Sequence, residues 1–445
     1  MLGKILGRFH ARNSSIVHTL RVIGGGLSGC EAALQLACRG FNVDLYEMRK
    51  GDGRTPAHKT SNLAELVCSN SFKGTQLTSA HGLLKNELKM LGSFLLQAAE
   101  KARVPAGESL TVDREIFSKE IERLMADSKK ITLHPNECTD LNSDVPTLVA
   151  AGPLCSEALA EQIKNITGEK FLHFFDAIAP VIESDSIDHS LAYAMNRHGK
   201  GDSADFINCP LDKETYLEFV KRLQEADSVE EKPFEKGELF EGCLPIEEMA
   251  RRGADTLRFG PMRPIGLGKH YAVIQLRAEN AQKTLYNMVG FQTRLKWNCQ
   301  KEIFRLVPAL KNAEFARLGC MHRNTFIESP KLLDKTLKLN SHKIWFAGQI
   351  TGAEGYTEAI ATGWYAAWNM ANYLQGRETE LLPHGTCIRA LVEAITAPNE
   401  HFQPMNFNFG LLPRPENLRK SMRKDFLTQQ SKKNLSIFLQ CCQKN

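Results

Sequence analysis

Two cysteines have neighbours that suit chemistry better than packing. Cys68 lies in NLAELVCSNS, between the apolar run 63–67 and the polar run 69–71. Cys243 lies in FEGCLPIEEMARRG, just before a predicted helix whose first residue is Pro245. A helix N-terminus favours the thiolate, the nucleophilic form of cysteine, although the nearby acidic residues oppose this effect. The pattern predicts two functional thiols, one of them in a polar cleft, and the alternative for each is a packing role.

A glycine-rich turn near the start of the chain predicts a second kind of site. An apolar run ends at Ile23, a helical pattern follows the turn, and a second predicted strand, 41–46, ends at Glu47. In a GxGxxG turn the first glycine permits the tight turn, the second admits a pyrophosphate, and the third lets helix and strand pack closely. The helix N-terminus then faces the phosphates, and the acid accepts ribose hydroxyl groups. These features predict a dinucleotide-binding unit with Gly24, Gly25, Gly26, Leu27, Ser28, Gly29 and Glu47 as cofactor-binding residues.

A second glycine-rich loop indicates which dinucleotide is bound. Residues 343–374 predict a strand, a glycine-rich loop and a long helix of small residues. A chain that begins with a dinucleotide unit and returns to this pattern resembles FAD-dependent oxidoreductases, where the second loop places a helix N-terminus beside the flavin. The alternative is a simple strand-to-helix turn. Gln349 stands where the acidic residue of such loops is usual, and the predicted FAD-binding residues are Gly348, Gln349, Gly352, Gly355 and Tyr356.

The elements that position these residues define the expected fold. We predict an α/β protein with a discontinuous, Rossmann-like FAD-binding domain and an inserted, smaller α/β domain. Its elements include a helix over 112–125 capped by Asp113, a buried strand over 145–151, a strand over 271–278 and one helix over 81–99. The predicted divisions are an N-terminal extension (1–14), the FAD-binding domain (15–201 and 318–413), the insertion (202–317) and a basic tail (414–445).

Composition narrows the class of protein. The chain has 445 residues, of which 42% are hydrophobic and 24% charged, which suffices for two or three domains. It contains no run of about 20 uncharged apolar residues, so no membrane association is expected. The 12 cysteines form no CxxC pair, which favours free thiols in a reducing compartment, and no metal site is predicted. The net charge of +5 is concentrated at the two ends of the chain, so composition alone does not indicate nucleic-acid binding.

Nine segments together resemble the TrmFO family of folate- and FAD-dependent tRNA methyltransferases. They are GGGLSG, DLYEMR, TPAHKT, AELVCSNS, RVPAGESLTVDR, FEGCLPIEEMARRGADTLRFGPM, TLYNMVGFQTRLKW, MHRNTFIESPKLLD and FAGQITGAEGY. The resemblance as a whole extends from about Arg21 to Pro413. The resemblance implies methylation of uracil C5 at position 54 in the T loop of tRNA. It also implies that the carbon comes from 5,10-methylenetetrahydrofolate and the electrons from NAD(P)H through FAD.

This reaction would give the two cysteines catalytic roles. Uracil C5 is too poor a nucleophile to take a one-carbon unit unaided, but a thiolate added at C6 makes C5 nucleophilic. After the carbon is attached, the C5 proton must leave and a hydride must arrive. Under the resemblance, Cys243 is the better candidate for the C6 nucleophile, and Cys68 removes the C5 proton or protects the flavin. The two roles can be exchanged.

The expected substrate is a tRNA bound between the insertion and the FAD-binding domain. Arg258, Arg263, Arg277 and Arg294 of the insertion are candidates to hold a flipped uridine, with a structural ion pair as the alternative for each. Two alternative functions use the same cofactor chemistry. One is methylation of a ribosomal RNA uridine, and the other is modification of the tRNA wobble uridine as in the longer GidA (MnmG) family. A third is a flavoprotein that binds RNA or a partner without methylating, which the two cysteines argue against.

The composition of the first 15 residues bears on the cellular location of the protein. We expect a cytoplasmic protein with no obligate protein partner. Residues 1–15 are basic and free of acidic residues, so a transit peptide that directs the chain to an organelle is the alternative.

Overall fold

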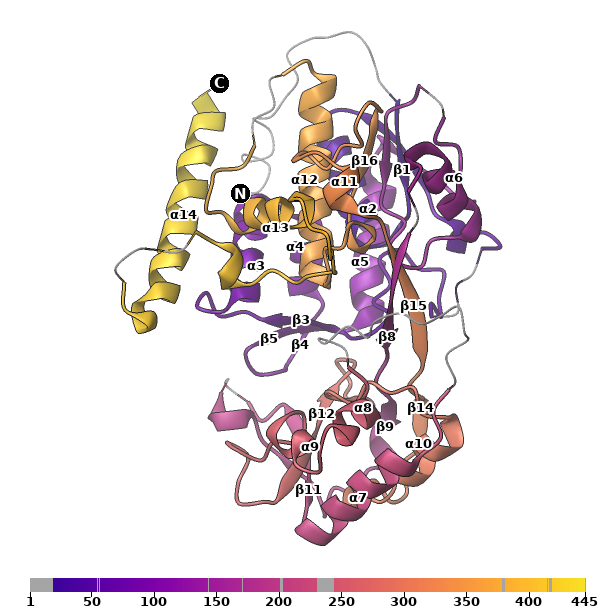
Figure 1. Cartoon of the computed structure of the whole chain (residues 1–445), viewed down its shortest axis with the longest axis vertical. Coiled ribbons are helices and arrows are strands. Elements are labelled where there is room, and N and C mark those ends of the chain that lie inside the picture. Colours follow the sequence, from indigo (N-terminus) through magenta and orange to yellow (C-terminus); the bar gives the residue numbers. More distant parts are fainter. Residues whose placement is uncertain are drawn as a thin grey trace.

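A parallel sheet of five strands forms the centre of the larger half of the molecule (Figure 1). The computed structural model describes residues 19–444 except 54, 56, 143, 170, 201–202, 230–243, 378–380, 414 and 416–417. Runs rich in Val, Ile and Leu favour strands that are covered on both faces. In spatial order the strands are β16 (Ile344–Phe346), β7 (Thr147–Val149), β1 (Thr19–Ile23), β2 (Asn42–Tyr46) and β6 (Ile131–His134).

The carboxyl end of β1 lies at the switch point of this sheet. From β1 the chain crosses through α2 (Leu27–Cys38) to β2 on one side, whereas β7 pairs with β1 on the other side. Ligands of open parallel sheets bind in the crevice at such a point. The glycine-rich loop that follows β1 therefore lies at the edge of the sheet where a nucleotide is expected.

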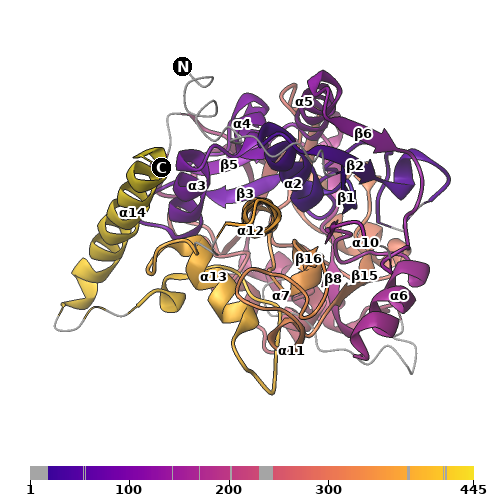
Figure 2. The same cartoon turned by 90° about the horizontal axis from the view of Figure 1, so that it is seen from above.

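Helix α12 (Tyr356–Leu374) packs closely against α2 (Figure 2). A Cβ atom on Gly363 would lie 2.4 Å from the carbonyl oxygen of Ser28, so the contact requires a residue without a side chain. Both helices are buried along most of their length, and burial of apolar surface contributes roughly 25 cal/mol per Å². The close contact brings the loop before α12 to the loop before α2, although the two loops are more than 300 residues apart in the sequence.

The predicted helix over 81–99 is wrong, because two helices occupy this region. Helix α3 ends at Met90, Gly92 adopts a left-handed backbone with φ +74°, and the side chain of Ser93 caps α4. The helix predicted with Asp113 as its cap is confirmed as α5. The helices of this half other than α2, α12 and α14 are α3 (Ala80–Met90), α4 (Phe94–Lys101), α5 (Arg114–Asp127), α6 (Glu157–Thr167), α11 (Ser329–Leu332) and α13 (Cys387–Thr396).

Helix α14 (Lys420–Lys444) lies beside α3 (Figure 2), and a buried carboxylate fastens it to the body of the molecule. Glu87 on α3 accepts hydrogen bonds from the N–H groups of Cys387 (2.6 Å) and Ile388 (3.1 Å) at the start of α13. The hydroxyl group of Ser431 on α14 donates to the same carboxylate. Burial raises the pKa of Glu87, and these hydrogen bonds oppose the shift. One carboxylate therefore joins three helices.

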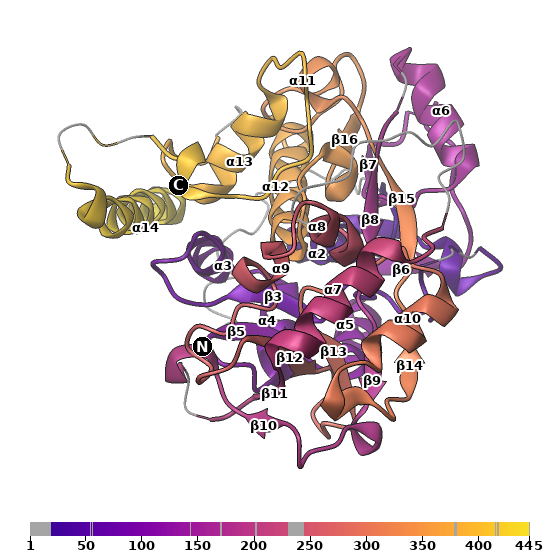
Figure 3. The same ribbon diagram turned by 60° about the horizontal axis from the view of Figure 1, so that its bottom comes forward.

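The second half of the molecule contains an antiparallel sheet (Figure 3). Helices α7 (Lys213–Glu225) and α10 (Trp297–Phe304) pack on it around a separate core of Tyr, Phe and aliphatic side chains. The short helices α8 (Ile246–Arg251) and α9 (Thr256–Phe259) join this core. In spatial order its strands are β10 (Tyr193–Ala194), β11 (Phe206–Leu211), β12 (Ala272–Ala278), β13 (Leu285–Met288), β9 (Val181–Glu183) and β14 (Phe315–Arg317).

Two small sheets lie near the junction of the halves. One pairs β8 (Leu172–Ala177) with β15 (Met321–Phe326), which carry the chain into and out of the second half (Figure 1). The other consists of β3 (Ser71–Gly74), β5 (Ser109–Val112) and β4 (Arg103–Val104). The predicted fold class is confirmed. The division at residue 202 stays a prediction, and the second sheet takes β9 and β10 from before that residue.

Two further properties concern the described part of the chain. None of its eleven cysteines forms a disulfide bond. None of its helices combines the length and apolar character needed to cross a membrane.

Candidate active site

The loop after β1 is shaped by glycines at two tightly packed positions. Gly24 has φ +104°, and a Cβ there would lie 2.4 Å from the carbonyl oxygen of Ala150. A Cβ on Gly29 would lie 1.8 Å from the carbonyl oxygen of Gly24. In contrast, a Cβ on Gly26 would meet nothing within 4 Å, and this residue lines a cleft at the end of the sheet. The backbone at Gly26 is thus open to a ligand.

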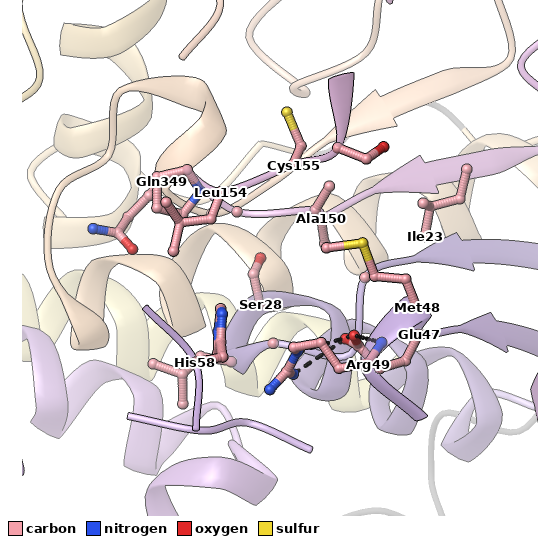
Figure 4. A pocket seen from close by; sticks show the side chains of 18 of the residues that line it. Ile23, Ser28, Glu47, Met48, Arg49, His58, Ala150, Leu154, Cys155 and Gln349 are labelled. Carbon is pink, nitrogen blue, oxygen red and sulfur yellow. Dashed lines mark hydrogen bonds and ion pairs between the residues drawn. The ribbon is translucent and has the colours of Figure 1, made fainter. Parts of the chain in front are cut away.

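The N-terminus of α2 offers free donors to that cleft. No side chain caps the helix, whose N-cap is Gly26. The hydroxyl group of Ser28 is buried, lines the cleft and has no hydrogen-bond partner among the described residues (Figure 4). Free N–H groups at a helix N-terminus bind phosphate, and the open backbone at Gly26 leaves room for one. The residues at this position fit the pyrophosphate of a dinucleotide.

Glu47 is held at the end of β2 by two kinds of contact. Its Oε2 accepts the N–H of Gly25 at 2.7 Å, and its Oε1 lies 3.0 Å from Nε of Arg49 (Figure 4). Burial alone would raise the pKa of Glu47, but the charge and hydrogen bonds of Arg49 and the Gly25 N–H outweigh it and lower the pKa. Glu47 is therefore ionised at neutral pH. Arg49 is not among the site residues predicted from the sequence, although it follows Glu47 by only two positions.

The second glycine-rich loop meets the first one. Gly348 has φ +85°, and a Cβ there would lie 2.9 Å from Cβ of Ser28. The side-chain amide of Gln349 donates to both carboxylate oxygens of Glu354 at 2.9 Å, so its place in the loop is fixed from within the loop. Gly348 and Gln349 line the cleft together with Tyr356.

The predicted cofactor-binding residues therefore fall into two groups. One group lines the cleft, and the other lies outside its lining. Tyr46, Met48, Asn136, Cys138, Leu154 and Cys155 also line the cleft and were not predicted, since their roles depend on which strand ends lie side by side. The wall holds Gly24, Gly26, Leu27, Ser28, Glu47, Gly348, Gln349 and Tyr356, whereas Gly25, Gly29, Gly352 and Gly355 are outside the lining.

Cys68 lies in the cleft wall, where Tyr356 holds its backbone. The hydroxyl oxygen of Tyr356 accepts the N–H groups of Cys68 and Ser69, each at 3.0 Å, and the hydroxyl donates to the carbonyl of Ser69 at 3.0 Å. Burial, followed by the neighbouring Cys68, raises the pKa of Tyr356. Tyr356 is therefore a neutral phenol that fixes the polar segment after Cys68 against the start of α12.

The second half of the molecule holds the same segment from the other side. Arg277 of β12 donates to the hydroxyl oxygen of Ser69 at 2.9 Å and to Oδ1 of Asn70 at 3.2 Å. The amide of Asn70 donates to the carbonyl of Ala278 at 3.0 Å, and Nη1 of Arg317 donates to the carbonyl of Val67 at 3.2 Å. Cys68 therefore sits in a segment clamped between the two halves.

Cys243 lies outside the described residues. The structure shows that α8 begins at Ile246, with Pro245 as its N-cap, one residue later than predicted. Glu247 in its first turn is fully buried and accepts the hydroxyl of Thr293 at 2.8 Å and the N–H of Arg294 at 2.9 Å. Burial raises the pKa of Glu247. The roles predicted for both cysteines and for the loop residues stay predictions.

Another thiol of the cleft has a different environment. Cys155 lines the cleft near the start of α6, and burial raises its pKa to about 11. It is therefore protonated at neutral pH and a poor nucleophile. No cluster of three or more His, Cys, Asp or Glu side chains suited to a metal ion occurs in the described part of the chain.

Comparisons with known proteins agree in sequence and in fold. A family model described as glucose inhibited division protein A matches residues 19–378. The methylenetetrahydrofolate–tRNA-(uracil-5-)-methyltransferase TrmFO of Natranaerobius thermophilus is 48% identical over 430 residues, which cover 95% of this chain and 99% of that protein. The protein of the same name from Geobacter sulfurreducens is 48% identical over 427 residues, covering 94% and 98%.

A solved structure shares the fold at lower identity. GidA of Aquifex aeolicus superposes with a TM-score of 0.70 at 16% identity, over 98% of this chain and 75% of that chain. The resemblance predicted from nine sequence segments is thus confirmed by relatives that match nearly from end to end. The chain belongs to the TrmFO family, within the larger group that the GidA family model describes.

Proposed function

We propose that this protein methylates C5 of uracil at position 54 in the T loop of tRNA, with 5,10-methylenetetrahydrofolate as the carbon donor. FAD held by the glycine-rich loops of the cleft would supply the hydride, with NAD(P)H as the reductant. The observation that carries the proposal is the place of Cys68, in the wall of a dinucleotide-type cleft and in contact with Tyr356. Relatives named for this activity are 48% identical to the chain.

The residues around Cys68 suit thiol chemistry. Its backbone is fixed by Tyr356, and the adjoining residues are fixed by Arg277 and Arg317. A positioned thiolate can add to C6 of uracil or accept the C5 proton once the carbon is attached.

We assign the C6 nucleophile to Cys243 and the proton at C5, or protection of the flavin, to Cys68. Adding the thiolate forms the bond between sulfur and C6 and makes C5 nucleophilic. C5 then takes the methylene group from its nitrogen carrier. Loss of the C5 proton expels that nitrogen and leaves an exocyclic methylene group, which a hydride converts to methyl. Elimination of the thiolate from C6 then restores the C5–C6 double bond. In the alternative assignment Cys68 is the C6 nucleophile and Cys243 takes the other role, and the steps of the reaction are unchanged.

The assignment is tested with 5-fluorouridine RNA, because fluorine at C5 blocks the elimination that releases the thiol. We expect wild type and Cys68→Ala to form an adduct that resists denaturation, and Cys243→Ala to form none while it still binds FAD. Cys155→Ala removes a cleft thiol whose pKa is raised and serves as the matched control. It should form the adduct and keep methylation activity.

Two results would contradict this account. An adduct with Cys243→Ala and none with Cys68→Ala would reverse the roles. Full methylation by both variants would show that both cysteines are packing residues.

The proposal also specifies which uridine is methylated and where in the cell the protein acts. A ribosomal uridine and the wobble uridine are the alternative targets, and mapping of methyluridine by mass in cellular RNA distinguishes them. We propose a cytoplasmic location without an obligate protein partner. Residues 1–15, on which the organelle alternative depends, lie outside the described residues.

A further inference from the structure

Three arginine side chains from both halves of the molecule converge beside Cys68. Arg114 is the first residue of α5, Arg277 lies in β12, and Arg317 ends β14. Nε of Arg114 lies 3.2 Å from Oε2 of Glu279, which directly follows β12. Arg277 and Arg317 contact the segment around Cys68 directly. These three side chains are called the arginine cluster below.

The arginine cluster has more donors than protein acceptors. Nε and Nη2 of Arg317 and Nη2 of Arg114 are buried and have no hydrogen-bond partner among the described residues. A buried donor without an acceptor is costly, and a charged one more so. The side chain of Arg114 is 24% exposed, so the cluster reaches solvent on that side.

Charge in this region is also unbalanced. The carboxylate of Glu279 interacts electrostatically with Arg277 and Arg317 and forms an ion pair with Arg114. Burial first, and then the charge of Arg114, lowers the pKa of Arg317. The pKa of Lys59 is lowered by its partial burial and by Arg317 and Arg114. Among the described residues, the cluster therefore carries an excess of positive charge, which fits an anion with several oxygen atoms.

We infer that the arginine cluster binds a phosphodiester group of the RNA next to the target uridine. This inference rests on the proposed function. A base that reacts at a thiol in this cleft has its own phosphates less than one nucleotide away. Guanidinium forks bind phosphate oxygens in pairs, and such contacts position RNA without reading its sequence. The flipped base would then be held by its backbone while C5 and C6 face the reacting groups.

The test measures binding of a T-arm RNA hairpin to the FAD-loaded protein as a function of salt. Each contacted phosphate of a single strand contributes about 0.7 to the slope of log Kd against log salt. We expect Arg317→Gln and Arg114→Gln each to weaken binding about tenfold. If both arginines share one phosphate, the double variant should lose no more slope than either single one. Arg317→Lys should keep the slope and lose part of the affinity, since it retains the charge without the fork.

Arg123→Gln is the matched control. Arg123 lies on the same helix as Arg114 and pairs with Glu120 and Asp127 on the outer surface, so its loss changes the net charge equally. It should leave both Kd and slope unchanged. Retained flavin absorbance shows that each variant is folded.

The inference is overturned if wild type methylates the RNA while both Gln variants keep its Kd and salt slope. It is also overturned if RNA binding is unchanged and the KM for methylenetetrahydrofolate rises, which would assign the cluster to the folate carboxylates. A rise confined to the KM for NAD(P)H would assign it to the phosphates of that dinucleotide. A wild type that binds the RNA but methylates no RNA would instead contradict the proposed function.

Discussion

The side chains of Glu47 and Tyr356 both accept hydrogen bonds from backbone N–H groups at the cleft. The sequence predicts Glu47 as a ribose acceptor, and in the structure its carboxylate also holds the N–H of Gly25 and the side chain of Arg49. Tyr356, predicted as a flavin-side residue, also fixes the backbone of Cys68 and Ser69. Spacing can identify such residues, but their partners come from segments that only the fold brings together.

Gly26 allows a sharp test of the cofactor site at this scale. Its backbone is extended with φ −77°, which any residue adopts, and a Cβ there would meet no protein atom within 4 Å. We therefore expect Gly26→Val to fold with little change in Tm of the FAD-free protein and to lose bound FAD, because the side chain would occupy the space of the pyrophosphate. Flavin absorbance of the purified variant measures this.

Gly29→Val provides the contrast. Its Cβ would lie 1.8 Å from the carbonyl oxygen of Gly24, so this variant should fail to fold. If the Gly26→Val protein is yellow and binds FAD with the affinity of wild type, the loop after β1 is not part of the cofactor site.

At the scale of elements, helices and strands with local sequence signals are predicted correctly, whereas the pairing of strands is not. The helix capped by Asp113 and the strand over 271–278 are present as α5 and β12, since capping and alternation are local. The run 81–99 was predicted as one helix because apolar periodicity continues through Gly92, whereas the left-handed turn there and the Ser93 cap divide it. The pairing of β9 with β13 and β14 joins distant residues and leaves no local signal.

Asn70 ties elements of both halves together and yields a prediction. Its side-chain amide donates to the carbonyls of Val112 and Ala278 at 3.0 Å, and its Oδ1 accepts Nε of Arg277 at 3.2 Å. Asn70→Ala leaves these buried groups unpaired, which should lower the free energy of unfolding by about 1–3 kcal/mol. Methylation should fall because the segment of Cys68 is no longer fixed, whereas FAD should stay bound.

Urea unfolding and a methylation assay measure the two effects. The control is Asn86→Ala on α3, because the one hydrogen bond of this side chain among the described residues is a 3.4 Å contact to the sulfur of Met90. It should change neither quantity. Wild-type methylation by Asn70→Ala would show that this link does not position Cys68.

At the scale of the whole molecule, the site is made from parts that lie far apart in the sequence. The loop after β1 and the loop before α12 meet at the end of the parallel sheet, and β12 and β14 bring Arg277 and Arg317 to Cys68. Repeated strand–glycine–helix patterns made the two loops predictable. The convergence of arginines was not, because it depends on how the two halves are placed against each other.

The central claim is that this chain transfers a folate carbon to uracil C5 of tRNA. The direct measurement supplies purified protein with isotope-labelled methylenetetrahydrofolate, NADPH and a tRNA transcript, and maps the product by mass spectrometry. The account predicts one labelled methyl group at uridine 54, dependent on both NADPH and folate and unaffected by S-adenosylmethionine. Methyl label taken from S-adenosylmethionine without folate, or no methylation of the transcript by FAD-loaded protein, would contradict it.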